Sequence, residues 1–182
     1  PYILPGVVSL TNLRFMLLQD WGIINSILLK IGLISEPIPW LTGKMALISI
    51  IIGNIWIRWP LWFITILASL QSIPGELYEA AKVDGASDWQ GFRRITLPSI
   101  SPTITVLTVL TALWSFNNFT VPFILTGGSP SKEANILSLN IWIRSFKNWD
   151  FGMGAAMSVV MMLIMLVLIL TYLKLTKLEE EQ

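Results

Sequence analysis

The chain has 182 residues, of which 54% are hydrophobic and 13% are charged, and its formal net charge is +1. With a mean hydropathy of +0.69, this composition is typical of a membrane protein, and the small net charge gives no long-range attraction to nucleic acid. The sequence has no cysteine and no histidine, which excludes disulfides and thiolate metal sites and removes the usual general base and zinc ligand. We therefore expect no catalytic residue, cofactor or metal ion on this chain.

The first part of the chain contains no complete membrane span. Residues 1–19 are apolar but are interrupted by two prolines, Asn12 and Arg14, and they are short for a span of about 20 residues. We interpret them as the outer end of a truncated span, in a chain that is the C-terminal portion of a longer protein. In residues 20–44 apolar side chains recur at helical spacing, which predicts an interfacial helix and loop along the membrane surface.

Three later stretches are predicted to cross the membrane. Residues 45–69 are the first, and at ~1.5 Å per residue they exceed a hydrocarbon core of ~30 Å, so some tilt is expected. Pro60 lies inside this span and is expected to kink it. The second span is predicted at residues 100–125 and the third at residues 153–175. Residues 126–152 between them are a polar connection with a small surface helix, and residues 176–182 are a tail.

A polar island, residues 70–99, separates the first two spans. A first short helix is predicted up to an Asp-Gly pair, where glycine supplies the backbone angles of a tight turn. A second short helix begins with Ser87 or Asp88 as its N-cap, and Pro98 is expected to end the unit. The island cannot lie in hydrocarbon because it carries seven ionisable side chains, which are Glu76, Glu79, Lys82, Asp84, Asp88, Arg93 and Arg94.

Polar residues in the first two spans are candidates for a solute path. Arg58 is a charge about half-way along the first span, where it costs roughly 2.5–3.5 kcal/mol of insertion free energy. In the second span, hydroxyl and amide side chains recur on one helical face. Sugar hydroxyls need hydrogen-bonding groups and an aromatic face, so the candidate lining consists of Asn54, Arg58, Thr111, Trp114, Ser115 and Asn118.

Two other roles are possible for these polar residues. Threonine and serine hydroxyls often bond to the backbone of their own helix, and asparagines can link neighbouring helices. Other tryptophans of the first span are expected to lie at the lipid or membrane interface rather than on a solute; these are Trp56, Trp59 and Trp62.

Several short motifs of the polar island resemble a known family. Glu79-Ala80-Ala81, Gly85 and the run Ile95 to Pro98 are similar to the EAA loop of binding-protein-dependent ABC importers. The surrounding sequence resembles the carbohydrate-type permease subunits of the maltose-transporter kind. The resemblance implies an all-α polytopic transmembrane helical bundle of the type I importer kind, with a cytoplasmic helix–turn–helix coupling loop. It assigns contact with the ATPase to Leu77, Glu79, Ala80, Ala81, Asp84 and Gly85.

The resemblance also implies the partners of the chain and its cellular location. It predicts one transmembrane domain of a multi-pass permease in a prokaryotic cell (inner) membrane, with a second permease subunit, a cytoplasmic ATP-binding subunit and an extracytoplasmic solute-binding protein. ATP and Mg would be bound by the ATPase subunit, because no phosphate-binding G-x-x-x-x-G-K-[ST] motif occurs here. The expected solutes are maltose, oligosaccharides or glycerol phosphate. Lysine and arginine are divided evenly between the two sides, so the orientation depends on the resemblance.

One alternative is a secondary, ion-coupled transporter without an ATPase partner. Such carriers usually show inverted repeats or acids within their spans, and the predicted spans contain no aspartate or glutamate. An intramembrane enzyme is a more remote alternative, because cysteine and histidine are both absent.

Overall fold

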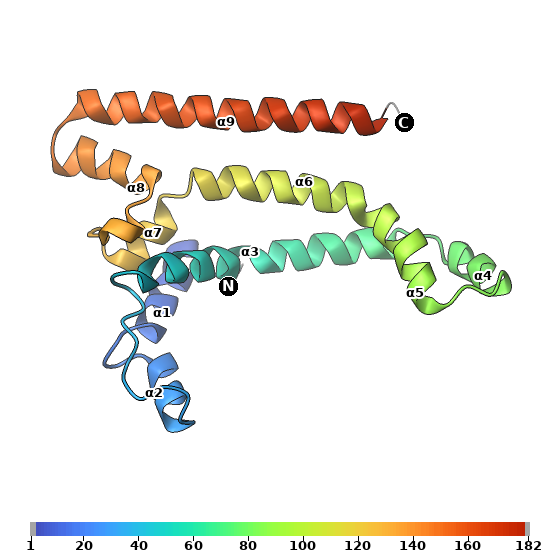
Figure 1. Ribbon diagram of the computed structural model, residues 1–182, viewed down its shortest axis with the longest axis horizontal. Helices are drawn as coiled ribbons and strands as arrows, with labels where there is room; N and C mark the ends of the chain where they lie inside the picture. The colour runs from blue at the N-terminus through green and yellow to red at the C-terminus, as the bar shows by residue number, and fades with distance from the viewer. Residues whose placement is uncertain (1–2, 181–182) are drawn as a thin grey trace. The chain divides into compact units, whose positions relative to one another are not determined.

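The computed structural model describes residues 3–180, with side chains placed up to Tyr172. As predicted for an all-α protein, the regular elements in this part of the chain are helices (Figure 1). The α-helices are α1 Gly6–Met16, α2 Ile23–Lys30, α3 Met45–Gln71, α4 Gly75–Val83, α5 Asp88–Gly91, α6 Leu97–Phe116, α7 Thr120–Thr126, α8 Leu137–Trp142 and α9 Phe151–Glu180. Shorter turns of π or 3₁₀ helix are η1 Phe92–Thr96, η2 Lys132–Ala134 and η3 Ile143–Lys147.

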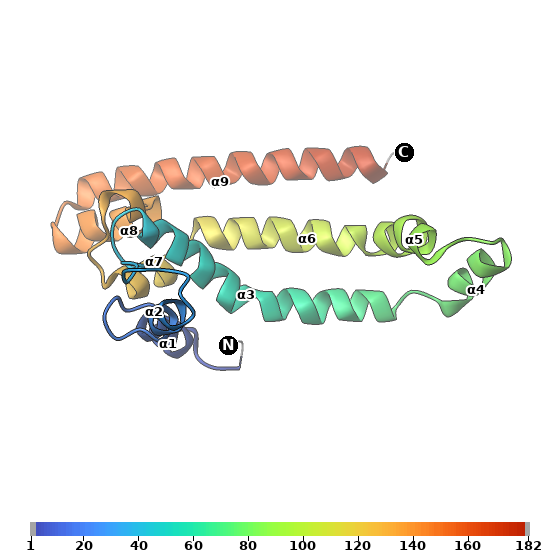
Figure 2. The same ribbon diagram turned by 60° about the horizontal axis from the view of Figure 1, so that its bottom comes forward.

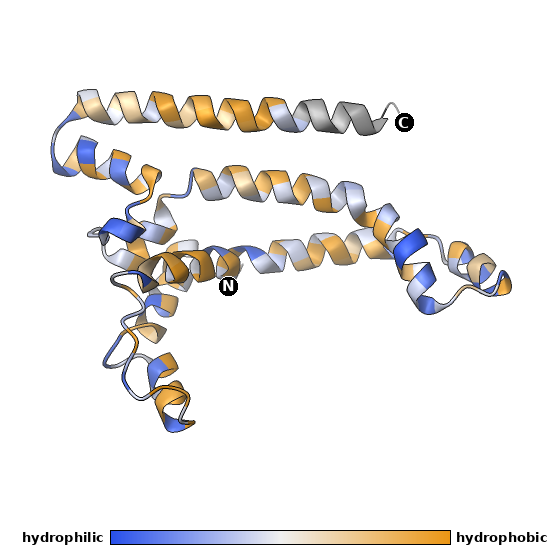
Figure 3. Ribbon diagram, in the orientation of Figure 1, coloured by the Kyte–Doolittle hydropathy of each residue, from blue (hydrophilic) through white to orange (hydrophobic). Residues whose placement is uncertain are grey.

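Within the described residues, three helical stretches are long and apolar enough to cross a membrane, as predicted. They are Met45–Gln71, Asp88–Phe116 and Phe151–Tyr172. Figure 3 shows hydrophobic residues along most of the coloured part of α9, whereas hydrophilic residues gather on α5. Most side chains of the three stretches are exposed in the isolated chain, which is the arrangement expected of helices whose outer faces meet lipid or other helices.

The chain divides into two compact units whose boundaries fall within α3 and α6. The first unit comprises the residues up to Ile57 and those from Leu113 onward. Its core joins α1, the beginning of α3, and α7 through buried apolar side chains. Gly53 on α3 permits this close packing, because a Cβ atom there would lie 2.9 Å from side-chain atoms of both Val121 and Leu125. The core cluster consists of Leu10, Leu13, Leu17, Ala46, Ile50, Val121, Leu125 and Ala134.

The segment between α1 and α3 is held by one buried asparagine. The Nδ2 of Asn25 donates to the backbone oxygens of Gln19 (3.0 Å) and Ile38 (2.9 Å). Its Oδ1 accepts from the backbone N–H of Ile38 (3.2 Å) and from Nε1 of Trp40 (2.8 Å). The side chain is 2% exposed, so these bonds replace its contacts with water and fix the loop after α2.

Replacing this asparagine should loosen the loop after α2. Asn25→Leu leaves four polar groups without their partner, and each buried group left unpaired costs about 1–3 kcal/mol. Limited proteolysis of the membrane-embedded protein is expected to cut residues 31–44 at least several times faster in the variant. Asn12→Leu is the matched control, because Asn12 is exposed on α1. Equal cleavage of Asn25→Leu and the wild type would contradict the role assigned to Asn25.

The second unit, Arg58–Ala112, is a helical hairpin. The later part of α3 and the earlier part of α6 run side by side in opposite directions, and α4 and α5 connect them (Figure 1, Figure 2). Hydrogen bonds cross the hairpin from Trp62 Nε1 to Thr111 Oγ1 (2.9 Å) and between the hydroxyls of Ser69 and Thr103 (3.1 Å). Interhelical hydrogen bonds of this kind stabilise packing where no water competes for the same groups.

The structure corrects two predicted boundaries of the second span. Pro98 does not end a helix; the chain is helical from Asp88 to Phe116 through η1. Proline lacks one N–H donor, and the wider π turn immediately before it accommodates the changed bonding pattern. The stretch 100–125 is not one helix either, because α6 ends at Phe116 and α7 begins at Thr120.

Helices also occur within the other predicted stretches, with bounds that differ from those expected. Residues 1–19 contain the short helix α1, the interfacial stretch contains α2, and Pro60 lies inside α3, which continues through it. The polar connection contains α8, extended by η3. The expected tail from residue 176 continues α9 as far as Glu180, and its last two residues lie outside the described part of the chain.

Candidate functional site

The α4–α5 segment has the helix–turn–helix form predicted for the coupling loop. Pro74 precedes α4, and Glu76 lies in its first turn, where a carboxylate interacts favourably with the positive end of the helix. The backbone of Gly85 has a φ of +78°, a conformation that glycine adopts without strain. Ser87 caps α5 in a capping box: its Oγ accepts from the N–H of Gln90, whose Oε1 accepts from the N–H of Ser87 at 2.8 Å.

The predicted coupling residues lie on an exposed surface of this segment. Leu77 is 48% exposed, and Glu79 and Ala80 are also exposed on α4. Asp84 and Gly85 are exposed at the turn, whereas Ala81 is half-buried toward α5. A mixed apolar and acidic helical surface of this kind suits docking into a groove of another protein.

Sequence reasoning missed an aromatic pair on the same segment. The rings of Trp89 and Phe92 stack with their centroids 5.5 Å apart, and the two residues are 67% and 43% exposed. With Val83, which is 88% exposed, they extend the apolar surface of the α4–α5 segment. Their spacing of three residues on a short predicted helix was the available signal, because i and i+3 side chains share a helical face.

In the first unit, the structure brings together two of the predicted lining residues. Asn118 Nδ2 donates to Asn54 Oδ1 at 2.8 Å, and Asn54 Nδ2 donates to the backbone oxygen of Ile50 at 2.9 Å. Asn118 Oδ1 accepts from the N–H of Val121 at 3.1 Å, which satisfies a backbone donor in the first turn of α7. Pro122, in the first turn of α7, has no N–H to donate to the carbonyl of Asn118 four residues earlier, so a proline and a capping asparagine together account for the break after Phe116.

The backbone carbonyl of the same asparagine is also engaged. Ser138, which lies on α8, donates from Oγ to the backbone oxygen of Asn118 at 2.9 Å. Asn118 therefore joins α3, α7 and α8. The sequence left open whether this asparagine lines a path or links helices, and its contacts favour the link. Ser138 was not singled out by its sequence.

The other predicted lining residues are divided between the two units. Ser115 is half-buried and Trp114 is 46% exposed in the first unit. Arg58 is half-buried in the second unit. Thr111 is engaged by Trp62, and the hydroxyl of the neighbouring Thr108 returns to the backbone oxygen of Ile104 at 2.8 Å.

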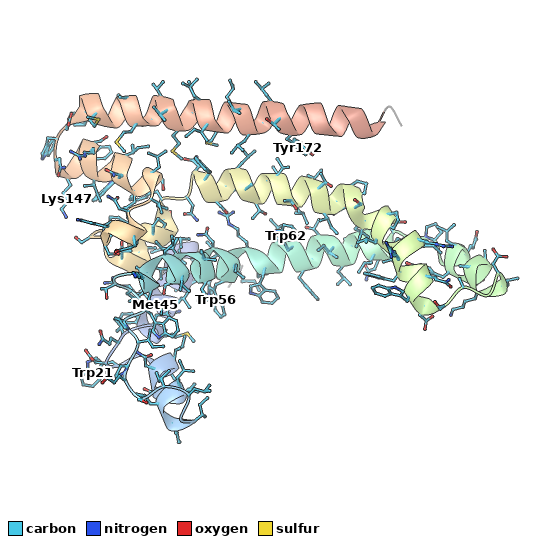
Figure 4. The ribbon with its side chains drawn as sticks, viewed as in Figure 1. Trp21, Met45, Trp56, Trp62, Lys147 and Tyr172 are labelled. Atoms are coloured by element: carbon cyan, nitrogen blue, oxygen red, sulfur yellow. The ribbon has the colours of Figure 1, made fainter. Side chains whose placement is uncertain are left out.

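Two tryptophans expected at the membrane interface also make contacts between helices. Trp62 projects from α3 toward α6, where it reaches Thr111 (Figure 4). In the first unit, Trp56 Nε1 donates to Ser9 Oγ on α1 at 3.0 Å. Both residues therefore do more than anchor the chain in lipid, because an indole N–H away from water requires an acceptor.

A cavity of about 540 Å³ lies between α8 and α9 in the first unit. Its wall is mostly apolar and includes Met161, Met162 and Met165, with few polar groups. A wall of this chemistry suits a hydrocarbon or an apolar helix better than a sugar.

The fold defines a polytopic membrane subunit with a helix–turn–helix, the α4–α5 segment, after its first long apolar helix. The chain belongs to the family of binding-protein-dependent transport system inner membrane components, whose model matches residues 1–177. It is 33% identical to the trehalose/maltose transport system permease protein MalF of Thermococcus litoralis, over 96% of this chain and 58% of that protein. It is 32% identical to the diacetylchitobiose uptake system permease protein DasB of Streptomyces coelicolor, over 99% of this chain and 56% of that protein.

Solved structures show the same fold. A bacterial ABC transporter involved in the import of the acidic polysaccharide alginate matches with a TM-score of 0.82 and 28% identity, over 97% of this chain and 62% of that one. The alginate transporter in complex with a periplasmic protein that holds an alginate pentasaccharide matches with a TM-score of 0.81 and 29% identity. The chain thus spans about three fifths of the length of the relatives it matches.

Proposed function

We propose that this chain forms part of the permease subunit of an ATP-driven, binding-protein-dependent importer of sugars. The observation that carries the proposal is the exposed α4–α5 segment, whose Glu79-Ala80-Ala81 and Gly85 stand between two helices able to cross a membrane. Relatives named for trehalose, maltose, diacetylchitobiose and alginate support a saccharide as the solute.

In this proposal α4 docks into a cytoplasmic ATP-binding subunit. Leu77 and Ala80 supply apolar contact, Glu79 supplies a charge, and the tight turn at Asp84 and Gly85 presents the end of α4. Closure of the ATPase dimer around ATP and Mg moves α4, and the two short helices α4 and α5 pass that motion to α6. A helix in a groove suits this task because its contacts are distributed along one rigid face.

The solute path is proposed to run beside the break between α6 and α7. Asn54 and Asn118 hold the break in place, because each amide is engaged in hydrogen bonds within the first unit. Arg58, Thr111, Trp114 and Ser115 remain candidates for the lining, which then consists of side chains on α3 and α6. Broken helices within membrane proteins are tolerated where they border such a path.

Three partners complete the proposed importer. They are a second permease subunit, the cytoplasmic ATP-binding subunit and an extracytoplasmic solute-binding protein. The alginate transporter was solved together with its periplasmic binding protein, which supports the last of these. No residue of this chain is assigned to ATP hydrolysis.

Copurification and reconstitution test the proposed function. The affinity-tagged full-length subunit, purified from its native host, is expected to bring down an ATP-binding protein and a second permease. In proteoliposomes whose lumen corresponds to the cytoplasm, the complex should import a maltodextrin only when ATP is in the lumen and the binding protein is outside. Uptake driven by an ion gradient without ATP would instead support a secondary transporter and refute the proposal.

A further inference from the structure

One hydrogen bond ties the helix α4 to the base of α6. The hydroxyl of Tyr78, on α4, lies 2.8 Å from Oγ1 of Thr96, the last residue of η1. Tyr78 is half-buried, and its ring lies over the buried Gly91, where a Cβ atom would come within 3.9 Å of Tyr78 Cδ1. The tyrosine therefore crosses α5 to reach the wide turn through which α5 continues into α6.

Beside this hydrogen bond, an open space separates α4 from α5. A cavity of about 300 Å³ lies between the two helices and is lined in part by Tyr78, Ala81, Ala86 and Gly91. The covalent link between the helices is the tight turn at Gly85, which is closed by backbone bonds from Gly85 N–H to Lys82 O (3.0 Å) and from Ala86 N–H to Ala81 O (2.9 Å); these bonds do not hold α4 against α5 or α6, so the turn can serve as a pivot. A helix that is linked by a pivot and separated by a cavity needs a side-chain bond to fix its angle.

The Tyr78–Thr96 bond is the last of three hydrogen bonds spaced along the hairpin. The Ser69–Thr103 bond lies seven residues further along α6, and the Trp62–Thr111 bond lies eight residues beyond that. On α3 and α4 the partners follow in the opposite order, as they must in an antiparallel hairpin. We call these three bonds the hairpin seam. Within the spans, the Ser69–Thr103 and Trp62–Thr111 bonds hold the two helices in one register, because their partners cannot turn to water there.

We propose that Tyr78 is a positioning residue for transport: its bond to Thr96 fixes the angle of α4 on α6, so that a displacement of α4 moves the hairpin as one body. The inference rests on the proposed function, in which α4 receives the motion of the ATPase. Without the bond, α4 turns about Gly85 and part of its displacement is lost before it reaches the spans. Tyr78 need not touch the solute or the nucleotide for this role.

Removal of one hydroxyl at a time tests the proposal in the full transporter. Tyr78→Phe and Thr96→Val each remove the bond and keep the shape of the side chain. In proteoliposomes with the ATPase and the binding protein, the number of maltodextrin molecules imported per ATP is expected to fall on the order of fivefold, the factor to which one net hydrogen bond corresponds. Complex assembly and the affinity of the binding protein for solute should not change.

The double variant distinguishes a shared bond from two separate effects. Tyr78→Phe/Thr96→Val should lose no more coupling than either single variant, because both remove the same interaction. The control is Thr105→Val on α6, whose hydroxyl returns to the backbone oxygen of Ser101 at 3.0 Å; it should keep the wild-type stoichiometry. Losses that multiply in the double variant, or single variants with wild-type stoichiometry, would overturn the proposal.

Hydrogen exchange gives a readout that does not depend on transport. In Tyr78→Phe, the backbone amides of residues 75–83 should exchange faster than in the wild type, whereas those of α6 should be unaffected. Unchanged exchange in α4 would overturn the proposal even if transport were reduced. A wild-type complex that shows no ATP-driven uptake would refute the proposed function itself, whereas faster exchange in α4 with intact ATP-driven coupling would refute only the role assigned to Tyr78.

Discussion

Glu79→Lys in the full-length subunit is expected to reduce ATP-driven sugar uptake by tenfold or more. Glu79 is exposed on α4, so the substitution should leave the fold of the helix intact and reverse one charge on the docking surface. Removing one partner of a charge pair that becomes buried in a complex costs about 2–5 kcal/mol. The loss should appear as less ATPase subunit recovered with the permease and as ATP hydrolysis that no longer responds to the binding protein.

The control for this variant is the same charge reversal elsewhere. Glu133 is exposed in the turn η2 of the first unit, and Glu133→Lys should bring down the ATPase as the wild type does. The mirror substitution Lys82→Glu, near the other end of α4, reports whether any change of charge on this helix is tolerated. Wild-type uptake and ATPase recovery in Glu79→Lys would remove Glu79 from the docking surface.

Asn118→Ala is expected to lower both uptake and the stability of the purified complex. The substitution leaves Asn54 Oδ1 and the N–H of Val121 without the partners that lie at 2.8 Å and 3.1 Å. Each buried group left unpaired costs about 1–3 kcal/mol, so the apparent melting temperature should fall by several degrees. A residue that only contacted the solute would reduce uptake and leave the melting temperature unchanged.

The adjacent asparagine is the matched control for this experiment. Asn117 is exposed and borders the cavity between α8 and α9, so Asn117→Ala should melt as the wild type does. Asn54→Ala should reproduce the loss seen with Asn118→Ala, because the two amides share one bond. An Asn118→Ala complex that melts with the wild type but changes its preference among sugars would show that Asn118 contacts solute and does not hold the helix break.

Local signals in the sequence were sufficient to predict the elements of the α4–α5 segment. Gly85 has the left-handed backbone that the predicted tight turn requires, and Ser87 caps the helix that follows it. Both features depend on a few neighbouring residues, and the chemistry of those residues acts over one turn. The location of the spans in the hydrocarbon of the membrane could also be predicted, because the composition and length of a helix decide whether it is stable there.

The same reasoning was wrong where a local rule competed with a distant contact. Pro98 usually ends a helix, yet here the chain remains helical through it after a π turn. The predicted span from 100 to 125 contains Pro122 close to the break after Phe116, and this local signal was not used. The break also involves Asn118, whose partners include Asn54, which is 64 residues away in the chain.

Composition, apolar run length and turn chemistry in the sequence thus determined that this is an all-helical membrane protein with a capped helix–turn–helix between two spans. The tertiary structure alone decided the hydrogen-bond partners of single polar side chains: Asn118 bonds to Asn54, Trp62 to Thr111, and Tyr78 to Thr96. The physical reason is that a hydroxyl, an amide or an indole N–H can serve a solute, its own backbone or another helix equally well. Which of these it serves depends on the atom that folding places within about 3 Å of it.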